Sequence, residues 1–367
     1  EDVFEAGVAC SAKTMYPDWL SLTGKGYVAS MYKKYGKIIS PMGCRAFLSP
    51  WYEQGGMHPA FDGDEPVFVG RFNIGVVSLH LPMILAKARK ESRDFYEVLD
   101  YYLELIRRLH IRTYAYLGEM RASTNPLAYC EGGFYGGHLK LTDKIKPVLK
   151  TATASFGITA LNELQMLYNG KSLVEDGAFA LEVMEHINKR VDEFKEEDGN
   201  LYAIYGTPAE SLCYRFAEID KKRFGEIPDV TDKGYYTNSY HVDVREKIDA
   251  FEKFRFESQF QKISSGGAIS YVEIPNMRHN LEALEDVVRF IYDNIQYAEF
   301  NTKSDYCHVC GYDGEIIIND DLEWECPQCH NKDKNKMNVT RRTCGYLGEN
   351  FWNVGKTKEI NARTLHL

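Results

Sequence analysis

The sequence predicts an α/β body over residues 1–300, followed by a small cysteine-rich module and a short C-terminal segment. Apolar segments of strand character alternate with longer segments of helical period up to about residue 300, and this alternation is typical of α/β proteins. Beyond that point the composition changes to Cys, Asn, Asp and Lys, and five of the nine cysteines lie in the last 61 residues. We therefore divide the chain into residues 1–300, 301–335 and 336–367.

The composition and the charge exclude several classes of protein. Hydrophobic residues make up 44% of the 367 residues, so the chain is not disordered as a whole. Asp and Glu outnumber Lys and Arg by 53 to 44, and this net charge of −9 argues against nucleic-acid binding as the main role. No run of about 18 apolar residues is present, so we expect no membrane-spanning helix. The odd number of cysteines favours a reducing cytoplasm, with metal-binding or catalytic duties for some thiols.

The first half of the body is punctuated by Gly and Pro, and its short apolar runs at 67–69 and 74–81 are predicted to be strands. A long helix is expected over 93–120, because its Leu and Ile residues recur at helical spacing. Residues 150–168 are predicted to begin with a Thr- and Ser-rich turn and to continue as a helix. An amphipathic helix over 173–196 is expected to stop near the following glycine.

The second half of the body continues the alternation. A strand over 200–205 leads into a helix that runs through Phe216, with Thr207 as candidate N-cap and Pro208 at the first helical position. The body is completed by a strand and a helix at 268–274 and 279–297.

Four cysteines form two CxxC pairs with 15 residues between them. Each pair can form a turn that points two thiolates at one cation, and the segment between the pairs can form a hairpin. Four thiolates in a tetrahedron favour Zn²⁺ first and iron second, and a site without an open position is structural, not catalytic. The predicted ligands are Cys307, Cys310, Cys326 and Cys329.

The segment Arg341-Arg342-Thr343-Cys344-Gly345-Tyr346-Leu347-Gly348 follows the cysteine module. A glycine in such a place can be an ordinary turn residue. In this context the segment resembles the C-terminal Arg-x-x-Gly-Tyr motif of glycyl radical enzymes. Because RRTCGYLG follows a four-cysteine site, it resembles the anaerobic (class III) ribonucleoside-triphosphate reductases in particular.

The resemblance implies that Gly345 carries a stored radical. An α-carbon radical is stabilised by delocalisation into both flanking amides, which requires a planar centre, and glycine has no Cβ to oppose that planarity. The family's partner, a radical-SAM activating enzyme with an iron–sulfur cluster, would generate the radical.

Met42-Gly43-Cys44-Arg45 resembles the finger loop of the same family. The resemblance makes Cys44 the thiyl radical that abstracts the 3′-hydrogen of a ribose, while the protein positions the substrate and excludes water. Taken alone, a cysteine in an apolar loop is usually buried and inert. Met42 resembles the members that use formate as reductant, and no spare cysteine pair is evident, so we expect formate. The remaining single cysteines are expected in the core; they are Cys10, Cys130 and Cys213.

Two further segments resemble the family's substrate-binding segments. Residues 70–75 match a segment whose asparagine lies near the ribose hydroxyls, which implies this role for Asn73; an amide can donate and accept without titrating. Residues 206–211 match a second substrate loop, where a helix N-terminus can hold phosphate, although an ordinary capped helix is the alternative. The implied substrate contacts are Thr207, Ala209, Glu210 and Ser211, and Glu210 could instead complete the cap. Residues 264–267 are a weaker candidate.

The resemblance implies the second half of a ten-stranded α/β barrel, with the zinc ribbon and the radical loop at its C-terminal end. Family members carry the first half-barrel and an allosteric nucleotide site ahead of the finger loop, whereas only 43 residues precede Cys44 here. Because the sequence also begins with Glu, we expect the upstream part to be missing or to be a separate polypeptide. Ribonucleoside triphosphates, a homodimer and the cytoplasm are implied, without flavin, haem, nicotinamide or membrane.

Two other functions stay open. A glycyl radical lyase of the pyruvate formate-lyase type has adjacent active-site cysteines in many members and no terminal four-cysteine ribbon. A non-enzymatic zinc-ribbon adaptor would use the basic residues of 331–342 to bind nucleic acid or protein, but it leaves residues 42–45, 70–75 and 206–211 unexplained.

Overall fold

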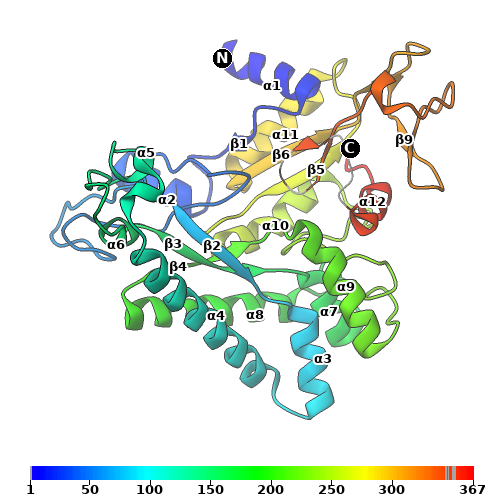
Figure 1. Cartoon of the computed structure of the whole chain (residues 1–367). Helices are drawn as coiled ribbons and strands as arrows, with labels where there is room; N and C mark the ends of the chain where they lie inside the picture. The colour runs from blue at the N-terminus through cyan, green and yellow to red at the C-terminus, as the bar shows by residue number, and fades with distance from the viewer. Residues whose placement is uncertain (1, 344, 346, 349–352) are drawn as a thin grey trace.

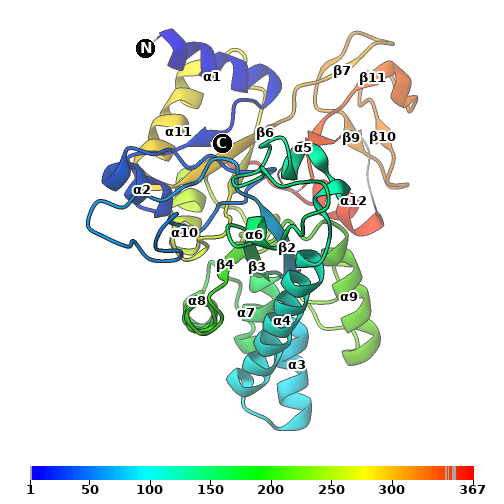
Figure 2. The same cartoon turned by 60° about the vertical axis from the view of Figure 1, so that its left-hand side comes forward.

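The structure is a computed structural model that describes residues 2–343, 345, 347–348 and 353–367. Strands of two sheets run through the centre of the molecule, helices pack outside them, and the cysteine-rich module projects at one corner (Figure 1). A view turned by 60° keeps this module apart from the long helices that cover the sheets (Figure 2).

The first sheet is parallel, with the order β2 (Asn73–Ser78), β3 (Thr153–Ile158) and β4 (Leu201–Gly206). Every residue of β3 and β4 is buried, as expected for parallel strands covered on both faces. The connections carry α4 (Phe95–Gly118) and α8 (Ala178–Asp198), whose apolar faces share one core with the strands. Burial of each large apolar side chain in this core contributes roughly 1.5–3 kcal/mol.

The second sheet contains β5 (Ser270–Ile274) and β6 (Tyr297–Thr302) in parallel, with β1 (Trp19–Leu20) antiparallel at the edge. The helices α10 (Ala250–Ile263) and α11 (Leu281–Asn294) bury their apolar residues against it. The N-terminal α1 lies beside α11 in both views (Figures 1 and 2).

A short seam joins the two sheets. Tyr205 at the end of β4 pairs in parallel with Gly267, just before β5. The bonds of the seam are Gly206 N–H to Gly267 O at 2.8 Å and Gly266 N–H to Ile204 O at 2.7 Å. Only glycine fits at 267, because a Cβ there would lie 2.1 Å from the Tyr205 ring. The strands β2 to β6 therefore form one parallel series, which agrees with the α/β class and with half of a ten-stranded barrel.

The other elements are shorter or lie outside the two sheets. The remaining helices are α1 (Asp2–Thr14), α2 (Tyr27–Tyr35), α3 (Leu81–Glu91), α5 (Pro126–Tyr129), α6 (Lys146–Leu149), α7 (Leu161–Asn169), α9 (Glu210–Phe224) and α12 (Val354–Asn361), with 3₁₀ turns at Ala122–Thr124 and Lys334–Lys336. The remaining strands are β7 (Asp305–Cys307), β8 (Asp313–Gly314), β9 (Ile317–Ile318), β10 (Trp324–Glu325), β11 (Met337–Asn338), β12 (Arg341–Arg342) and β13 (Leu347–Gly348).

Three local predictions are wrong. Residues 67–69 form no strand, and Val69 is 87% exposed. Residues 150–168 contain the buried strand β3 before the short helix α7, because a brief apolar run without alternation does not distinguish a buried strand from a helix. The helix predicted from Thr207 begins at Glu210, with Ala209 as N-cap in a left-handed conformation, and it extends to Phe224.

The last strand of the second sheet leads directly into the cysteine-rich module. Strand β6 continues to Thr302, and β7 of the cysteine-rich module begins three residues later at Asp305. In the described part of the chain, none of the helices has both the length and the apolar character needed to span a membrane.

Candidate active site and metal centre

The four predicted metal ligands converge in the cysteine-rich module. The sulfurs of Cys307 and Cys329 lie 3.7 Å apart, those of Cys310 and Cys326 lie 3.6 Å apart, and all four lie within 4.8 Å of one another. A zinc tetrahedron with Zn–S bonds of about 2.3 Å has sulfur–sulfur edges of ~3.8 Å. The thiols therefore fit one tetrahedral ion, and β9 and β10 form the predicted hairpin between the two pairs.

The module is tied to the rest of the chain by a buried arginine. Arg341 donates from Nη1 and Nη2 to the two carboxylate oxygens of Asp305, at 2.6 and 2.7 Å. Its guanidinium also lies 5.2 Å from the ring of Trp324, which belongs to the module's small core. Because both charges are buried and paired in a fork, this contact fixes strand β12 to the module.

We expect one zinc ion per chain, bound by the four thiolates. Cys326→Ser should lose the zinc and unfold the module, because structural zinc supplies much of the folding free energy of such small units. Elemental analysis of purified protein measures the content. Cys213→Ser changes a buried cysteine outside the module and should keep its zinc. Full zinc content in Cys326→Ser, or iron in place of zinc, would contradict this assignment.

The finger-loop cysteine lies at the tip of a tight hairpin. Met42 and Ala46 exchange both backbone hydrogen bonds, at 2.8 and 3.0 Å, and Gly43 takes a φ of +56° between them. Cys44 is half-buried at the tip, while the side chain of Met42 packs against an apolar cluster that contains Phe47.

The loop at 264–267 supports this hairpin from behind. Phe47 N–H donates to Gly266 O at 2.9 Å, and Ala268 N–H donates to Arg45 O at 3.1 Å. The finger loop is thus bonded to the seam between the two sheets. This contact assigns residues 264–267 a supporting role for the loop that carries Cys44.

Gly345 lies directly against Cys44. It is buried, with a φ of +121°, a conformation that residues with a Cβ rarely adopt. A Cβ built on Gly345 would lie 2.9 Å from Cys44 Cβ, 3.6 Å from Cys44 Sγ and 2.8 Å from Arg45 Nη2. The structure therefore brings together the two residues at which the sequence placed radical chemistry. The neighbouring Cys344 and Tyr346 of the motif lie outside the described residues.

Charged side chains that are buried or half-buried lie around this pair. Arg342 donates to Gly345 O at 3.1 Å, and it lies 2.9 Å from Glu299 and 2.8 Å from Asp18. Burial raises the pKa of Glu299 to about 9, whereas Arg342 acts in the opposite direction. Asp18 and Glu299 lie in unremarkable sequence contexts, and the only signal for Arg342 was its place in the motif.

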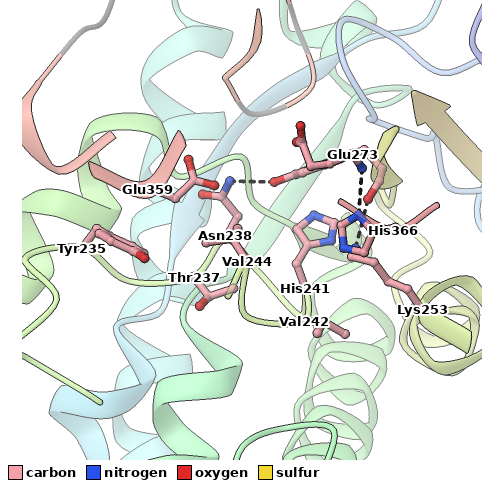
Figure 3. Close-up of a pocket in the computed structure, with 11 residues that line it drawn as sticks. Tyr235, Thr237, Asn238, His241, Val242, Val244, Lys253, Glu273, Glu359 and His366 are labelled. Carbon is pink, nitrogen blue, oxygen red and sulfur yellow. Dashed lines mark hydrogen bonds between the residues drawn. The ribbon is translucent and has the colours of Figure 1, made fainter. Parts of the chain in front are cut away.

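Buried polar groups also hold the C-terminal segment (Figure 3). The ring Nδ1 of His366 accepts the backbone N–H of Glu273 at 2.8 Å. The backbone N–H of His366 donates to Glu273 O, also at 2.8 Å. Burial lowers the pKa of His366 to about 3 and that of His241 to about 4, so both rings are neutral at pH 7. The cavity between them has a volume of about 10 Å³, room for about one water molecule and too little for a nucleotide.

Asn73 lies at the start of β2, and its amide is engaged within the sheet. Its Nδ2 donates to Ser155 Oγ at 2.6 Å, and its Oδ1 accepts Gly75 N–H at 2.7 Å. An amide has two N–H groups and two lone pairs, so within the described part of the chain one donor and one acceptor position stay available for a ligand.

Thr207 lies at the opposite, carboxyl end of the same sheet. Ser78 donates to Thr207 Oγ1 at 3.2 Å. A Cβ on Gly157 of β3 would lie 2.1 Å from this oxygen, so β3 must carry glycine at this position. Ala209 is buried, whereas Glu210 and Ser211 are exposed at the start of α9. Ser155, which the side-chain amide of Asn73 contacts, pairs with Ala203, four residues before Thr207, so this amide lies roughly 13 Å from Thr207 along the strands. The backbone of Asn73 pairs with Thr153 and lies two residues farther away.

The other single cysteines are distributed unevenly. Cys213 is buried and donates to Asn238 Oδ1 at 3.1 Å, and Cys130 is half-buried. The prediction of a core position is wrong for Cys10, which lies on the exposed side of α1, where its sulfur contacts the hydroxyl of Thr14.

Comparisons with known proteins agree with this geometry. The family model for anaerobic ribonucleoside-triphosphate reductase matches residues 1–366. The chain is 38% identical over 375 residues to the anaerobic ribonucleoside-triphosphate reductase of Haemophilus influenzae, of which it covers 50%, and 35% identical over 374 residues to that of Enterobacteria phage T4, of which it covers 58%. In both cases the match covers 100% of this chain, so the chain spans about half the length of the curated relatives it matches.

Solved structures show the same fold. An anaerobic ribonucleotide reductase superposes with a TM-score of 0.57 at 20% identity, over 79% of this chain and 44% of that one. The anaerobic ribonucleotide reductase from Thermotoga maritima with glycerol in the active site gives a TM-score of 0.53 at 20% identity, over 78% and 42%. Since the family model spans nearly all of the sequence, the chain belongs to the anaerobic ribonucleoside-triphosphate reductase family.

Proposed function

We propose that this chain is the radical-carrying portion of an anaerobic ribonucleoside-triphosphate reductase, which converts ribonucleoside triphosphates to 2′-deoxyribonucleoside triphosphates. The contact between Gly345 and Cys44 carries this proposal. Hydrogen-atom transfer requires near contact between the atom that gives the hydrogen and the atom that takes it. The Cys44 sulfur meets this requirement, because it lies 3.6 Å from the position that a Cβ on Gly345 would take.

In this proposal Gly345 stores the radical, and Cys44 passes its hydrogen atom to the α-carbon and becomes a thiyl. The thiyl takes the 3′-hydrogen of the bound ribose, and the 2′-hydroxyl accepts a proton and leaves as water. Formate supplies two electrons and a proton and becomes carbon dioxide, and Cys44 then returns the hydrogen atom to C3′. Burial of Gly345 in the described structure supports this role, because a stored radical needs protection from solvent and oxygen.

The remaining site residues receive roles that follow from their chemistry. Asn73 would bind ribose hydroxyls with its available donor and acceptor, and the loop of Thr207, Ala209, Glu210 and Ser211 would bind the phosphate end. The separation of roughly 13 Å along the strands suits an extended triphosphate better than a small acid. Met42 would mark the formate-dependent subtype.

Zn²⁺ would be structural, since the four thiolates leave no open position. We propose three parts, the body at 1–300, the ribbon at 301–335 and the radical segment at 336–367. A radical-SAM activating enzyme, a second copy of the chain and a polypeptide that supplies the other half-barrel are the proposed partners, in the cytoplasm.

Anaerobic activation tests the proposal. The chain, alone and with a polypeptide that supplies the other half-barrel, is incubated with the activating enzyme, S-adenosylmethionine and a reductant. We expect an EPR doublet from one α-hydrogen, and deoxynucleotide formation that depends on formate. Oxygen should then cut the chain at Gly345, which mass spectrometry detects. An intact mass after oxygen, with no doublet before it, would contradict the proposal, and carbon–carbon cleavage products would indicate the lyase.

A further inference from the structure

The side chain of Arg342 is enclosed by oxygen atoms. It lies on β12 with none of its surface exposed. Nε donates to Phe300 O at 2.7 Å, Nη2 donates to Met15 O at 2.7 Å and to Asp18 Oδ1 at 2.8 Å, and Nη1 donates to Gly345 O at 3.1 Å. Nη1 also lies 2.9 Å from Glu299 Oε2. A guanidinium has five N–H groups, and five oxygens surround this one.

These oxygens belong to parts of the chain that are far apart in sequence. Met15 and Asp18 lie just after α1, Glu299 and Phe300 lie on β6, and Gly345 lies 327 residues or more beyond the first pair. The planar fork of the guanidinium is rigid, so the position of four oxygens determines where the fifth must lie. Through Arg342, the position of the Gly345 carbonyl is therefore fixed relative to β6 and to the segment after α1.

Resting on the proposed function, we propose that Arg342 is a positioning residue that holds the Gly345 carbonyl so that the α-carbon of Gly345 faces the sulfur of Cys44. If the peptide group that contains the Gly345 carbonyl rotated, the α-hydrogen of Gly345 would turn away from the thiol of Cys44. A charge-assisted hydrogen bond from a buried guanidinium, which three further hydrogen bonds hold in place, opposes that rotation.

A second guanidinium completes the hold on this strand. Arg363 donates from Nη1 to Arg342 O at 2.8 Å and from Nη2 to Thr343 O at 3.5 Å, and it is itself paired with Glu273 and Glu359. The carbonyls of 342, 343 and 345 therefore all accept from buried arginines. Arg363 holds the approach to the loop, whereas Arg342 donates to the carbonyl of Gly345 itself.

The neighbouring Arg341 provides a matched control. It is also buried and paired, but its fork binds Asp305, and among the described residues it contacts neither Gly345 nor Cys44. Arg341→Lys and Arg342→Lys each keep a positive charge and replace five donors by three on a flexible stem. Only Arg342→Lys removes the fixed donor from the Gly345 carbonyl.

The first measurement needs no radical. Unactivated protein is alkylated anaerobically, and modification of Cys44 is followed by peptide mass spectrometry. Gly345 covers Cys44 in the wild type, so Arg342→Lys should be alkylated at Cys44 about tenfold faster, the loss that corresponds to one charge-assisted hydrogen bond. Arg341→Lys should stay within about twofold of wild type. Zinc content is measured in each variant to show that the module is folded.

The second measurement uses the activated enzyme. Arg342→Lys should lower kcat per EPR spin about tenfold with KM unchanged, because the radical is present but is misaligned with the thiol. Damage to the fold would instead lower the spin yield and leave kcat per spin unchanged. Wild-type alkylation rates at Cys44 in a folded Arg342→Lys protein, or unchanged kcat per spin, would overturn the inference. Absence of any doublet in the wild type would overturn the proposed function while the alkylation result still stood.

Discussion

Gly345→Ala is expected to abolish the EPR doublet and to reduce deoxynucleotide formation to background. The added Cβ would lie 2.8 Å from Arg45 Nη2 and 2.9 Å from Cys44 Cβ, distances that real Cβ atoms essentially never show. The φ of +121° adds backbone strain for any residue other than glycine. Alanine also opposes the planar α-carbon that the radical requires. EPR after anaerobic activation measures the first effect, and a formate-dependent product assay measures the second.

Gly199→Ala is a control for backbone strain, because it adds that strain without the steric clash and without changing the radical site. Gly199 ends α8 with a φ of +68°, but a Cβ there would meet no atom within 4 Å. This variant should lose about 1 kcal/mol of stability and keep the doublet. A doublet of wild-type intensity in Gly345→Ala would show that the radical resides elsewhere.

Cys44→Ser is expected to separate radical storage from turnover. The serine O–H bond is much stronger than the S–H bond, so the Gly345 radical cannot take that hydrogen atom. The doublet should persist, because Gly345 itself is unchanged, while product formation falls roughly 10⁴-fold or more. Activated protein is assayed for spin content and for deoxynucleotide in the same sample.

Cys130→Ser serves as the control for this variant. Cys130 is half-buried like Cys44, but it lies after α5 and has no contact with the finger hairpin among the described residues. Turnover should stay close to wild type. Substantial turnover in Cys44→Ser would remove this residue from the reaction, and loss of the doublet would indicate that Cys44 shapes the radical site itself.

Much of the fold could be predicted from periodicity. The long helices α4, α8 and α11 and the strands β2, β4 and β5 match their predicted ranges closely, because their apolar positions recur over many residues. The strand β3 could not be recognised, since a strand buried on both faces has no alternation. The helix α9 begins later than predicted, because Ala209 adopts a left-handed conformation that no sequence rule anticipates.

The candidate site was predictable where chemistry fixes the residue type. The four cysteines were identified from spacing and do converge, and Gly345 and Cys44 were identified from motifs and lie in contact. The acidic partners of Arg342 could not be predicted, because Asp18 and Glu299 become neighbours only when the segment after α1 and strand β6 pack against the C-terminal segment. Sequence separation hides such contacts.

The seam at Gly267 affects the order in which parts of the molecule unfold. Each sheet has its own apolar core, whereas few backbone bonds cross between Tyr205 and Gly267. Regions of this kind behave as separate cooperative units that open at different free energies. Since the backbone of the Cys44 hairpin is bonded to this junction, we expect gentle heating to displace Cys44 while the cores of both sheets are still largely native.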